Sequence, residues 1–124
     1  MKTMEIPEGS WAEFCSRVQK NSTGAMISIQ ITDSAGAVRA IAEEIPLQGV
    51  YWERGECNDQ LTIDAGPPNE RPLRHVVLAP IHLRLKDGCD DDRYNQWQIV
   101  AENGTTLVTI HPGLKVDFLK GSKL

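Results

Sequence analysis

Apolar positions near the start of the chain repeat with the period of a helix. Within residues 10–24, which read SWAEFCSRVQKNSTG, apolar side chains recur at i, i+3, i+4 and i+7 and share one stripe. These side chains are Trp11, Phe14, Cys15 and Val18. Ser10 and Glu13 have the S-x-x-E spacing of a capping box, which favours a helix start here. The pattern predicts an N-terminal helix whose Trp11 and Phe14 face a core.

After residue 24 the apolar period changes to two, as in β-strands. Alternating segments lie at 25–32, 37–45, 46–52, 60–66, 74–88 and 94–111, and turn residues separate most of them. The first two predict a hairpin, although the alanines and glutamates of 40–44 are also compatible with a helix. Because Pro80 has no amide hydrogen, the strand that contains it must lie at an edge, bulge or break in two.

The last segment contains Asn103-Gly104, the strongest turn signal in the chain. Asn-Gly supplies the two positive-φ positions of a type I′ hairpin. Apolar residues occur on both faces of the adjoining strands, and a strand buried on both faces needs two covering layers. The helix supplies one layer. A second subunit, giving a homodimer, is the predicted source of the other, and the apolar tail 114–119 is the competing source.

These elements predict an α+β fold, with the N-terminal helix packed on a curved antiparallel sheet or small open barrel of six to eight short strands. A flat two-layer sheet with one helix is the alternative. No β-α-β alternation occurs, so a parallel sheet with a dinucleotide site is not expected. The 124 residues fit a single domain, 1–124, with 1–9 and 120–124 expected to fray.

Charge and cysteine content narrow the partners and the compartment. Thirteen basic and 17 acidic residues give a net charge of -4, without any run of Lys or Arg, so no nucleic-acid partner is expected. The start lacks the apolar region of a signal peptide, and no stretch reaches the roughly 18 apolar residues of a membrane span. Cys15, Cys57 and Cys89 are irregularly spaced, which suits free thiols in a reducing cytoplasm. We therefore expect a cytoplasmic protein with no membrane partner.

The segment KDGCDDDRY, residues 86–94, concentrates four aspartates beside a cysteine. The calcium-loop pattern needs glycine at position 6 and glutamate at position 12, and it fails with Asp87 or Asp90 as position 1. Zinc would need further Cys or His ligands. Lys86 and Arg93 offset part of the negative charge. We expect residues 87–92 to form a solvated loop that binds no metal tightly, and weak cation binding is the alternative.

Four residues are candidates for ligand or partner binding. Tyr51 and Trp52 are adjacent, so in a strand one faces the core and the other solvent, and exposed Tyr or Trp residues lead interface hot spots. His75 and His82 differ by seven positions and face opposite ways in a regular strand, but a bulge at Pro80 would bring them to one face. No nucleophile motif, phosphate loop or dinucleotide motif occurs, so we predict no catalytic residue and no cofactor.

Four segments form a set that resembles a known family. They are W-x-x-F at Trp11 and Phe14, PLQGVYW at 46–52, HVVLAP at 75–80, and the closing hairpin with GTTLVTI at 104–110. Together they resemble a bacterial family of small domains of unknown function, the family numbered 5335, over residues 7–111. The resemblance implies a compact bacterial domain and no activity, since that family has no assigned chemistry.

The sequence therefore predicts a non-enzymatic binding or interaction module that self-associates. The first alternative is a barrel that binds a small ligand in a pocket near His75 and His82. The second and least favoured alternative is a hydrolase or metal enzyme, which would require a His–acid contact in a cleft or a bound metal.

Overall fold

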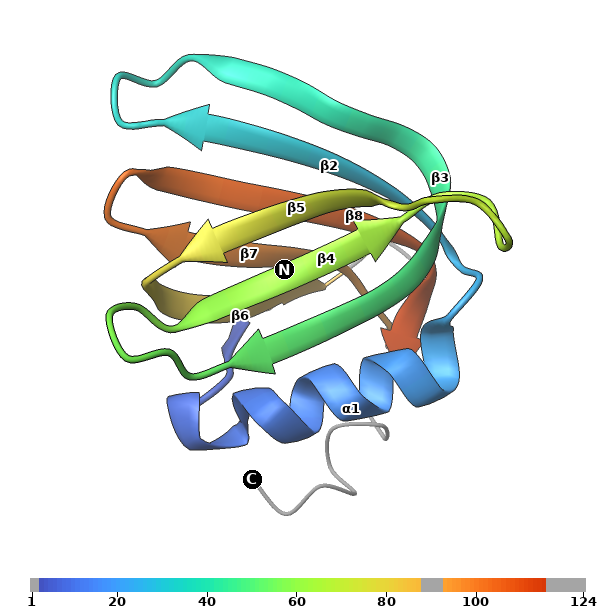
Figure 1. Ribbon diagram of the computed structural model, residues 1–124, viewed down its shortest axis with the longest axis horizontal. Coiled ribbons are helices and arrows are strands. Elements are labelled where there is room, and N and C mark those ends of the chain that lie inside the picture. The colour runs from blue at the N-terminus through green and yellow to red at the C-terminus, as the bar shows by residue number, and fades with distance from the viewer. Residues whose placement is uncertain (1–2, 88–92, 116–124) are drawn as a thin grey trace.

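The computed structural model describes residues 3–87 and 93–115 of the chain (Figure 1). The elements in this part are β1 (Thr3–Glu5), the 3-10 helix η1 (Glu8–Ser10), α1 (Trp11–Ser22), β2 (Met26–Asp33), β3 (Val38–Glu53), β4 (Gln60–Ala65), β5 (Leu73–Leu78), β6 (Pro80–Asp87), β7 (Arg93–Ala101) and β8 (Gly104–Lys115). The strands form one antiparallel sheet in the order β1-β6-β7-β8-β2-β3-β4-β5. The predicted α+β fold, an N-terminal helix on an antiparallel sheet, is confirmed at this level.

Strand β3 joins two layers of the sheet. Its first half, from Val38 to Pro46, pairs with β2, and its second half, from Leu47 to Glu53, pairs with β4. Near the junction Glu44 has a φ of 46°, and both ladders shift register. Such irregularities bend a strand. The second half of β3, β4 and β5 therefore fold across the other strands as a front layer (Figure 1), and the remaining strands with the first half of β3 form a back layer.

The bend corrects two expectations about the sheet. The sequence predicted separate strands at 37–45 and 46–52, but the structure has one strand of 16 residues. Pro46 lies where β3 changes neighbours, and its carbonyl accepts a hydrogen bond of 2.8 Å from the amide of Gly66. The sheet is larger than a small barrel of short strands, and within the described residues its end strands, β1 and β5, do not pair with each other.

The core lies between the layers and is closed along one side by α1 (Figure 1). Trp11, Phe14, Cys15 and Val18 are all buried, so the predicted stripe is confirmed. The Phe14 ring meets the Trp97 ring edge to face, with centroids 5.6 Å apart. The Ser10 side chain makes no capping bond within the described part of the chain, because η1 precedes α1 directly and replaces the predicted capping box.

Strand pairing and burial attach residues 3–9 to the rest of the fold. Strand β1 pairs with β6, where Met4 lies opposite Leu85. The Ile6 side chain is fully buried, and its carbonyl accepts a hydrogen bond of 2.7 Å from the Trp11 indole nitrogen. The burial of Ile6 and the hydrogen bond from Trp11 to its carbonyl therefore attach this segment to the helix.

Of the two strongest turn signals, the break at Pro80 has the predicted place and the Asn-Gly turn does not. The chain breaks at Pro80, where Ala79 has a φ of 50° and separates β5 from β6. The β7–β8 hairpin turns at Glu102 and Asn103, with Ala101 opposite Gly104. Among these residues only Gly104 has a positive φ, of 153°. The predicted type I′ turn centred on Asn103-Gly104 is therefore wrong by one position.

The β7–β8 hairpin buries one face rather than both. Its inward residues are buried beneath the front layer and α1: Trp97, Ile99, Ala101, Val108 and Ile110. On the outward face Val100 and Leu107 are only half-buried, and Thr109 is exposed. The expectation of apolar burial on both faces is wrong, so this hairpin does not itself require a second layer.

Two expectations fall partly or wholly outside the described residues. The aspartate loop is one, because residues 88–92 are not described and the side chains of Asp87 and Arg93 are not placed. The tail is the other. Leu114 is buried at the end of β8, whereas residues 116–124 lie beyond the described part.

Candidate functional site

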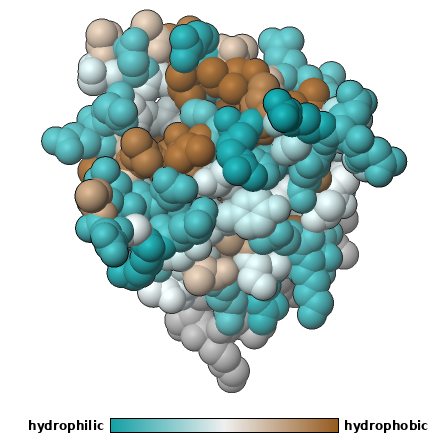
Figure 2. All heavy atoms as spheres, viewed as in Figure 1, coloured by the Kyte–Doolittle hydropathy of each residue, from teal (hydrophilic) through white to brown (hydrophobic). Residues whose placement is uncertain are grey.

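The outer face of the front layer meets α1 along a polar surface. Figure 2 shows hydrophilic residues over the lower part of this face and hydrophobic residues gathered above them. Strand β4 lies at the centre of the front layer and is buried on both sides. Leu61, Ile63 and Ala65 belong to the core. The alternate residues Thr62 and Asp64 are also buried, although they point away from the core, so neighbouring side chains must cover them.

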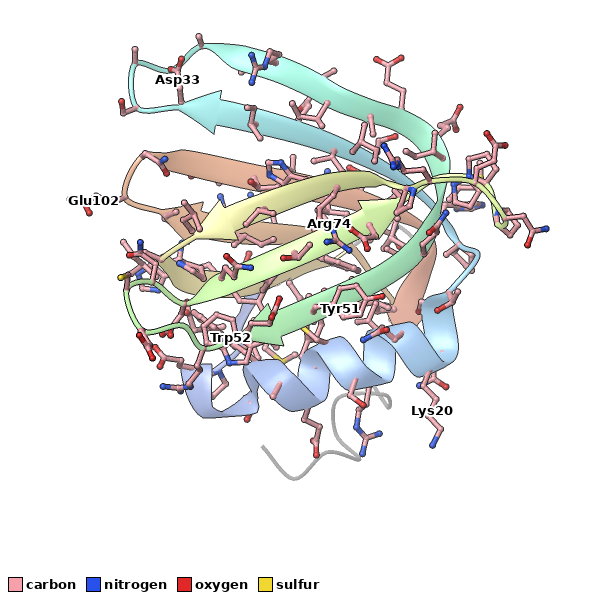
Figure 3. The ribbon with its side chains drawn as sticks, viewed as in Figure 1. Lys20, Asp33, Tyr51, Trp52, Arg74 and Glu102 are labelled. Carbon is pink, nitrogen blue, oxygen red and sulfur yellow. The ribbon has the colours of Figure 1, made fainter. Side chains whose placement is uncertain are left out.

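Arg74 is one of these covering side chains. It lies opposite Asp64 in the β4–β5 ladder, and its Nε and Nη2 atoms donate hydrogen bonds of 2.8 Å to the two carboxylate oxygens (Figure 3). The hydrogen bond with Asp64 raises the pKa of Arg74 above its ordinary value. A two-point Arg–carboxylate contact of this kind fixes the guanidinium plane. Arg74 is thus held in one orientation while most of its side chain stays open to solvent.

Tyr51 lies beside this ion pair and is positioned by Gly49. A Cβ atom at Gly49 would lie only 2.7 Å from the Cζ atom of Tyr51, so the phenol ring occupies the space above the glycine. Gly49 itself faces Asp64 across the β3–β4 ladder. The tyrosine remains exposed, and its ring therefore presents a fixed aromatic surface next to Arg74.

Trp52 turns toward the helix instead. Its ring meets Trp11 edge to face, with centroids 4.9 Å apart, and Arg54 lies over it at 5.8 Å from the centroid. Trp52 is half-buried. As expected for adjacent strand residues, Trp52 turns toward the core and Tyr51 toward solvent. Both side chains line one groove.

The groove between α1 and the front layer has a volume of about 670 Å³. Its helix side includes Ser16 and Gln19, and the Gln19 amide donates a hydrogen bond of 2.8 Å to the carbonyl of Val50. Besides Tyr51 and Trp52, its sheet side includes Glu53, Gln60, Thr62, Arg74 and Val76 (Figure 3). The arrangement offers two aromatic surfaces, an arginine, a glutamate and several uncharged polar groups, on regular elements rather than loops.

The structure does not bring His75 and His82 together. His75 Nε2 lies 3.0 Å from Thr106 Oγ1 of β8, beside a cavity of about 190 Å³. His82 Nδ1 lies 3.0 Å from Glu5 of β1, and Glu5 also accepts a hydrogen bond from Arg84, which lowers the Glu5 pKa. The break at Pro80 sends the two histidines to different neighbours, and His82 does not line the cavity beside His75.

His75 is expected to make stability depend on pH. Its burial lowers its pKa below the ordinary value of 6.5. Below about pH 6.5 the unfolded chain therefore binds a proton that the folded chain resists, and the free energy of unfolding falls as the pH falls. Above that pH this residue contributes no pH dependence.

The His75→Gln variant tests this expectation, since glutamine keeps a hydrogen-bonding group near Thr106 but cannot titrate. Urea unfolding of both proteins at about pH 7.5 and pH 5 should show a smaller loss of stability in the variant. Groups elsewhere titrate in both proteins and cancel in the comparison. Equal losses would show that His75 gains its proton as easily in the folded chain as in the unfolded one.

The described cysteines differ in exposure. Burial raises the pKa of Cys15 to about 12, and a thiol with so high a pKa is a poor nucleophile. Cys57 is exposed and free. In residues 3–87 and 93–115, no group of three or more His, Cys, Asp or Glu side chains is placed to hold a metal ion.

The sequence patterns pointed to Tyr51 and Trp52 but not to the ion pair between Asp64 and Arg74 beside them. Asp64 and Arg74 are ten positions apart in sequence, across a loop with three prolines, and they meet only because of the β4–β5 register. The available signal was an acid at an outward position of an alternating strand and an arginine at the start of the next. Their contact required knowledge of the loop geometry.

Comparison with known proteins adds a family. Among the described residues no helix has the length and apolar character that a membrane span needs. No curated protein and no solved structure matches the chain. One family, DUF5335, described as a family of unknown function, matches residues 2–116. This range takes in the helix, every strand and the groove, and the chain therefore belongs to the DUF5335 family.

Proposed function

We propose that this protein is a non-enzymatic interaction module that binds another protein through the groove between α1 and the front layer. The observation that carries the proposal is the grouping of Tyr51, Trp52 and Arg74 on one rigid surface. Tyrosine, tryptophan and arginine are the residue types that dominate binding energy at protein interfaces.

Preorganisation of these side chains supports the proposal. Two hydrogen bonds to Asp64 hold Arg74. The Tyr51 ring packs over Gly49, and the Trp52 ring packs against Trp11. Side chains already held in place lose little conformational freedom when a partner binds. The polar groups around them, among them Gln60 and Glu53, are suited to the hydrogen-bonding rim of an interface.

Three further observations bear on activity and compartment: two favour binding over catalysis, and one favours a reducing compartment. The Cys15 thiol has a raised pKa, which makes it a poor nucleophile, and His75 Nε2 lies within hydrogen-bond distance of Thr106. The exposed free thiol of Cys57 is typical of proteins in a reducing environment. We accordingly propose that the module acts in the bacterial cytoplasm.

A photo-crosslinking amino acid at Glu53, which lines the groove and is exposed, tests the proposal in the native cell. We expect a discrete adduct with another protein. The adduct should be lost when Tyr51→Ala is added, because truncating a hot-spot residue weakens binding by about tenfold or more. A thermal melt of each variant verifies that it is folded.

The matched control carries the same crosslinker at Glu43, an exposed residue of the back layer. It should give no adduct of that mass. Identical adducts from both positions, or an adduct at Glu53 that persists in the Tyr51→Ala background, would contradict the groove as the binding surface.

A further inference from the structure

The two ends of the sheet differ in how well they are protected. Strand β1, at one end, has three residues, and Glu5 on it is engaged by Arg84 and His82. Strand β5, at the other end, has six residues and contains no proline. A short charged edge discourages strand pairing, whereas a longer edge with apolar side chains invites it.

Exposed apolar side chains gather at the β5 end. Seven large apolar or aromatic side chains are exposed in the described part of the chain, and three of them lie on β5: Leu73, Val76 and Leu78. In Figure 2 hydrophobic residues lie along β5 and also above it, where Figure 1 has the back-layer strands β8 and β2. Such a gathering beside unpaired backbone groups marks an association surface.

We propose that β5 pairs with β5 of a second copy of this chain, antiparallel and about a two-fold axis at Val76. Only an edge that pairs with itself closes into a dimer, because β5 against β1 would be a head-to-tail contact that continues from copy to copy. The dimer would join two front layers into one continuous sheet, and it would bring together Arg74 and Val76, which also line the groove.

The sequence of β5 is self-complementary in this register. Val76 meets its own copy, Arg74 meets Leu78 and His75 meets Val77, which follows from the order LRHVVL. No charged residue lies directly opposite a like charge, an arrangement that would be destabilising. The Arg74 guanidinium is already paired with Asp64, which leaves its aliphatic stem to cover the leucine.

This surface replaces the one that the sequence suggested. The β7–β8 hairpin was the expected dimer face, but its outward side exposes Thr109 and leaves Val100 and Leu107 only half-exposed. Leu78 alone is 51% exposed. The exposed apolar side chains of β5 therefore form a better dimer face than the outward side of this hairpin.

Light scattering on the full chain and two lysine variants tests the dimer. The full chain should have about twice the monomer mass of 13.8 kDa. Leu78→Lys places an ammonium group opposite Arg74 of the other copy. The dissociation constant of the dimer should therefore rise about tenfold or more. Val38→Lys, at a side chain that is 60% exposed on β3, should stay dimeric.

A disulfide test fixes the register. Antiparallel neighbours have Cα atoms about 4.5–5.5 Å apart, which suits a disulfide. With Cys57 and Cys89 changed to serine, Val76→Cys should form a covalent dimer on mild oxidation, and Val38→Cys should not. A monomeric full chain, equal weakening by both lysines, or no covalent dimer through position 76 would overturn the proposal.

Discussion

Replacing Phe14 with alanine is expected to lower the free energy of unfolding by about 3–5 kcal/mol. The Phe14 side chain is 2% exposed, so the substitution leaves a cavity between α1 and the back layer. It also removes the edge-to-face contact with Trp97, a geometry that contributes about 0.5–1.5 kcal/mol beyond the buried area. Urea unfolding of the variant and the parent measures the loss.

Glu13→Ala is the matched control for this substitution. Glu13 precedes Phe14 in the same turn of α1 and is exposed, and its ion pair with Arg17 is long, at 3.7 Å. Exposed helical ion pairs of this kind contribute about 0.3–0.5 kcal/mol. A Phe14→Ala protein as stable as the Glu13→Ala protein would mean that the helix does not pack on the sheet through this residue.

Replacing Gly104 with alanine is expected to lower the free energy of unfolding by about 1–3 kcal/mol, the usual cost of a strained backbone position. Gly104 has a φ of 153°, and an added Cβ would lie 2.6 Å from the backbone oxygen of Thr32. Gly104 pairs with Asp33 at the end of the β2–β8 ladder. The methyl group would therefore push β8 away from β2 at this end, which chemical denaturation can quantify.

Two other glycines separate the strain from the steric clash. Gly36 has a φ of 92° but open space where a Cβ would lie, and Gly9 has open space without a positive φ. The loss of stability should rise in the order Gly9→Ala, Gly36→Ala, Gly104→Ala. If Gly36→Ala lowers the free energy of unfolding as much as Gly104→Ala does, the close approach of Thr32 to Gly104 contributes nothing to the loss. The hairpin end would then have room for a methyl group.

The sequence predicted the elements better than their partners. The helix was readable because its apolar stripe has a fixed period and one burial face. Its capping box was not formed, because local spacing cannot reveal that η1 occupies the turn before Trp11. Alternation likewise located the strands from β2 onward but not β1, and the continuity of β3 through Pro46 depends on neighbours that alternation does not encode.

The candidate site divides in the same way. Tyr51 and Trp52 could be chosen from residue type and adjacency alone, because aromatic residues are few in this chain. The pairing of Asp64 with Arg74 could not, since it rests on the register of two strands joined by a proline-rich loop. The proposed approach of His75 to His82 failed because the break at Ala79 sends β5 and β6 to different layers.

The order of strands in the sheet constrains how the protein is made. The front layer consists of neighbours in sequence, β3, β4 and β5, and so can form as soon as those residues leave the ribosome. The back layer cannot be completed so early, because β1 pairs with β6 and β2 pairs with β8, and both of these partners are made later. During synthesis β2 can pair with β3 but not yet with β8, so Ile27 and Ile29 lack their β8 neighbours until the last described strand is made. Pairings between such distant segments also slow folding, so refolding of the full chain should be slower than that of a helical protein of equal length.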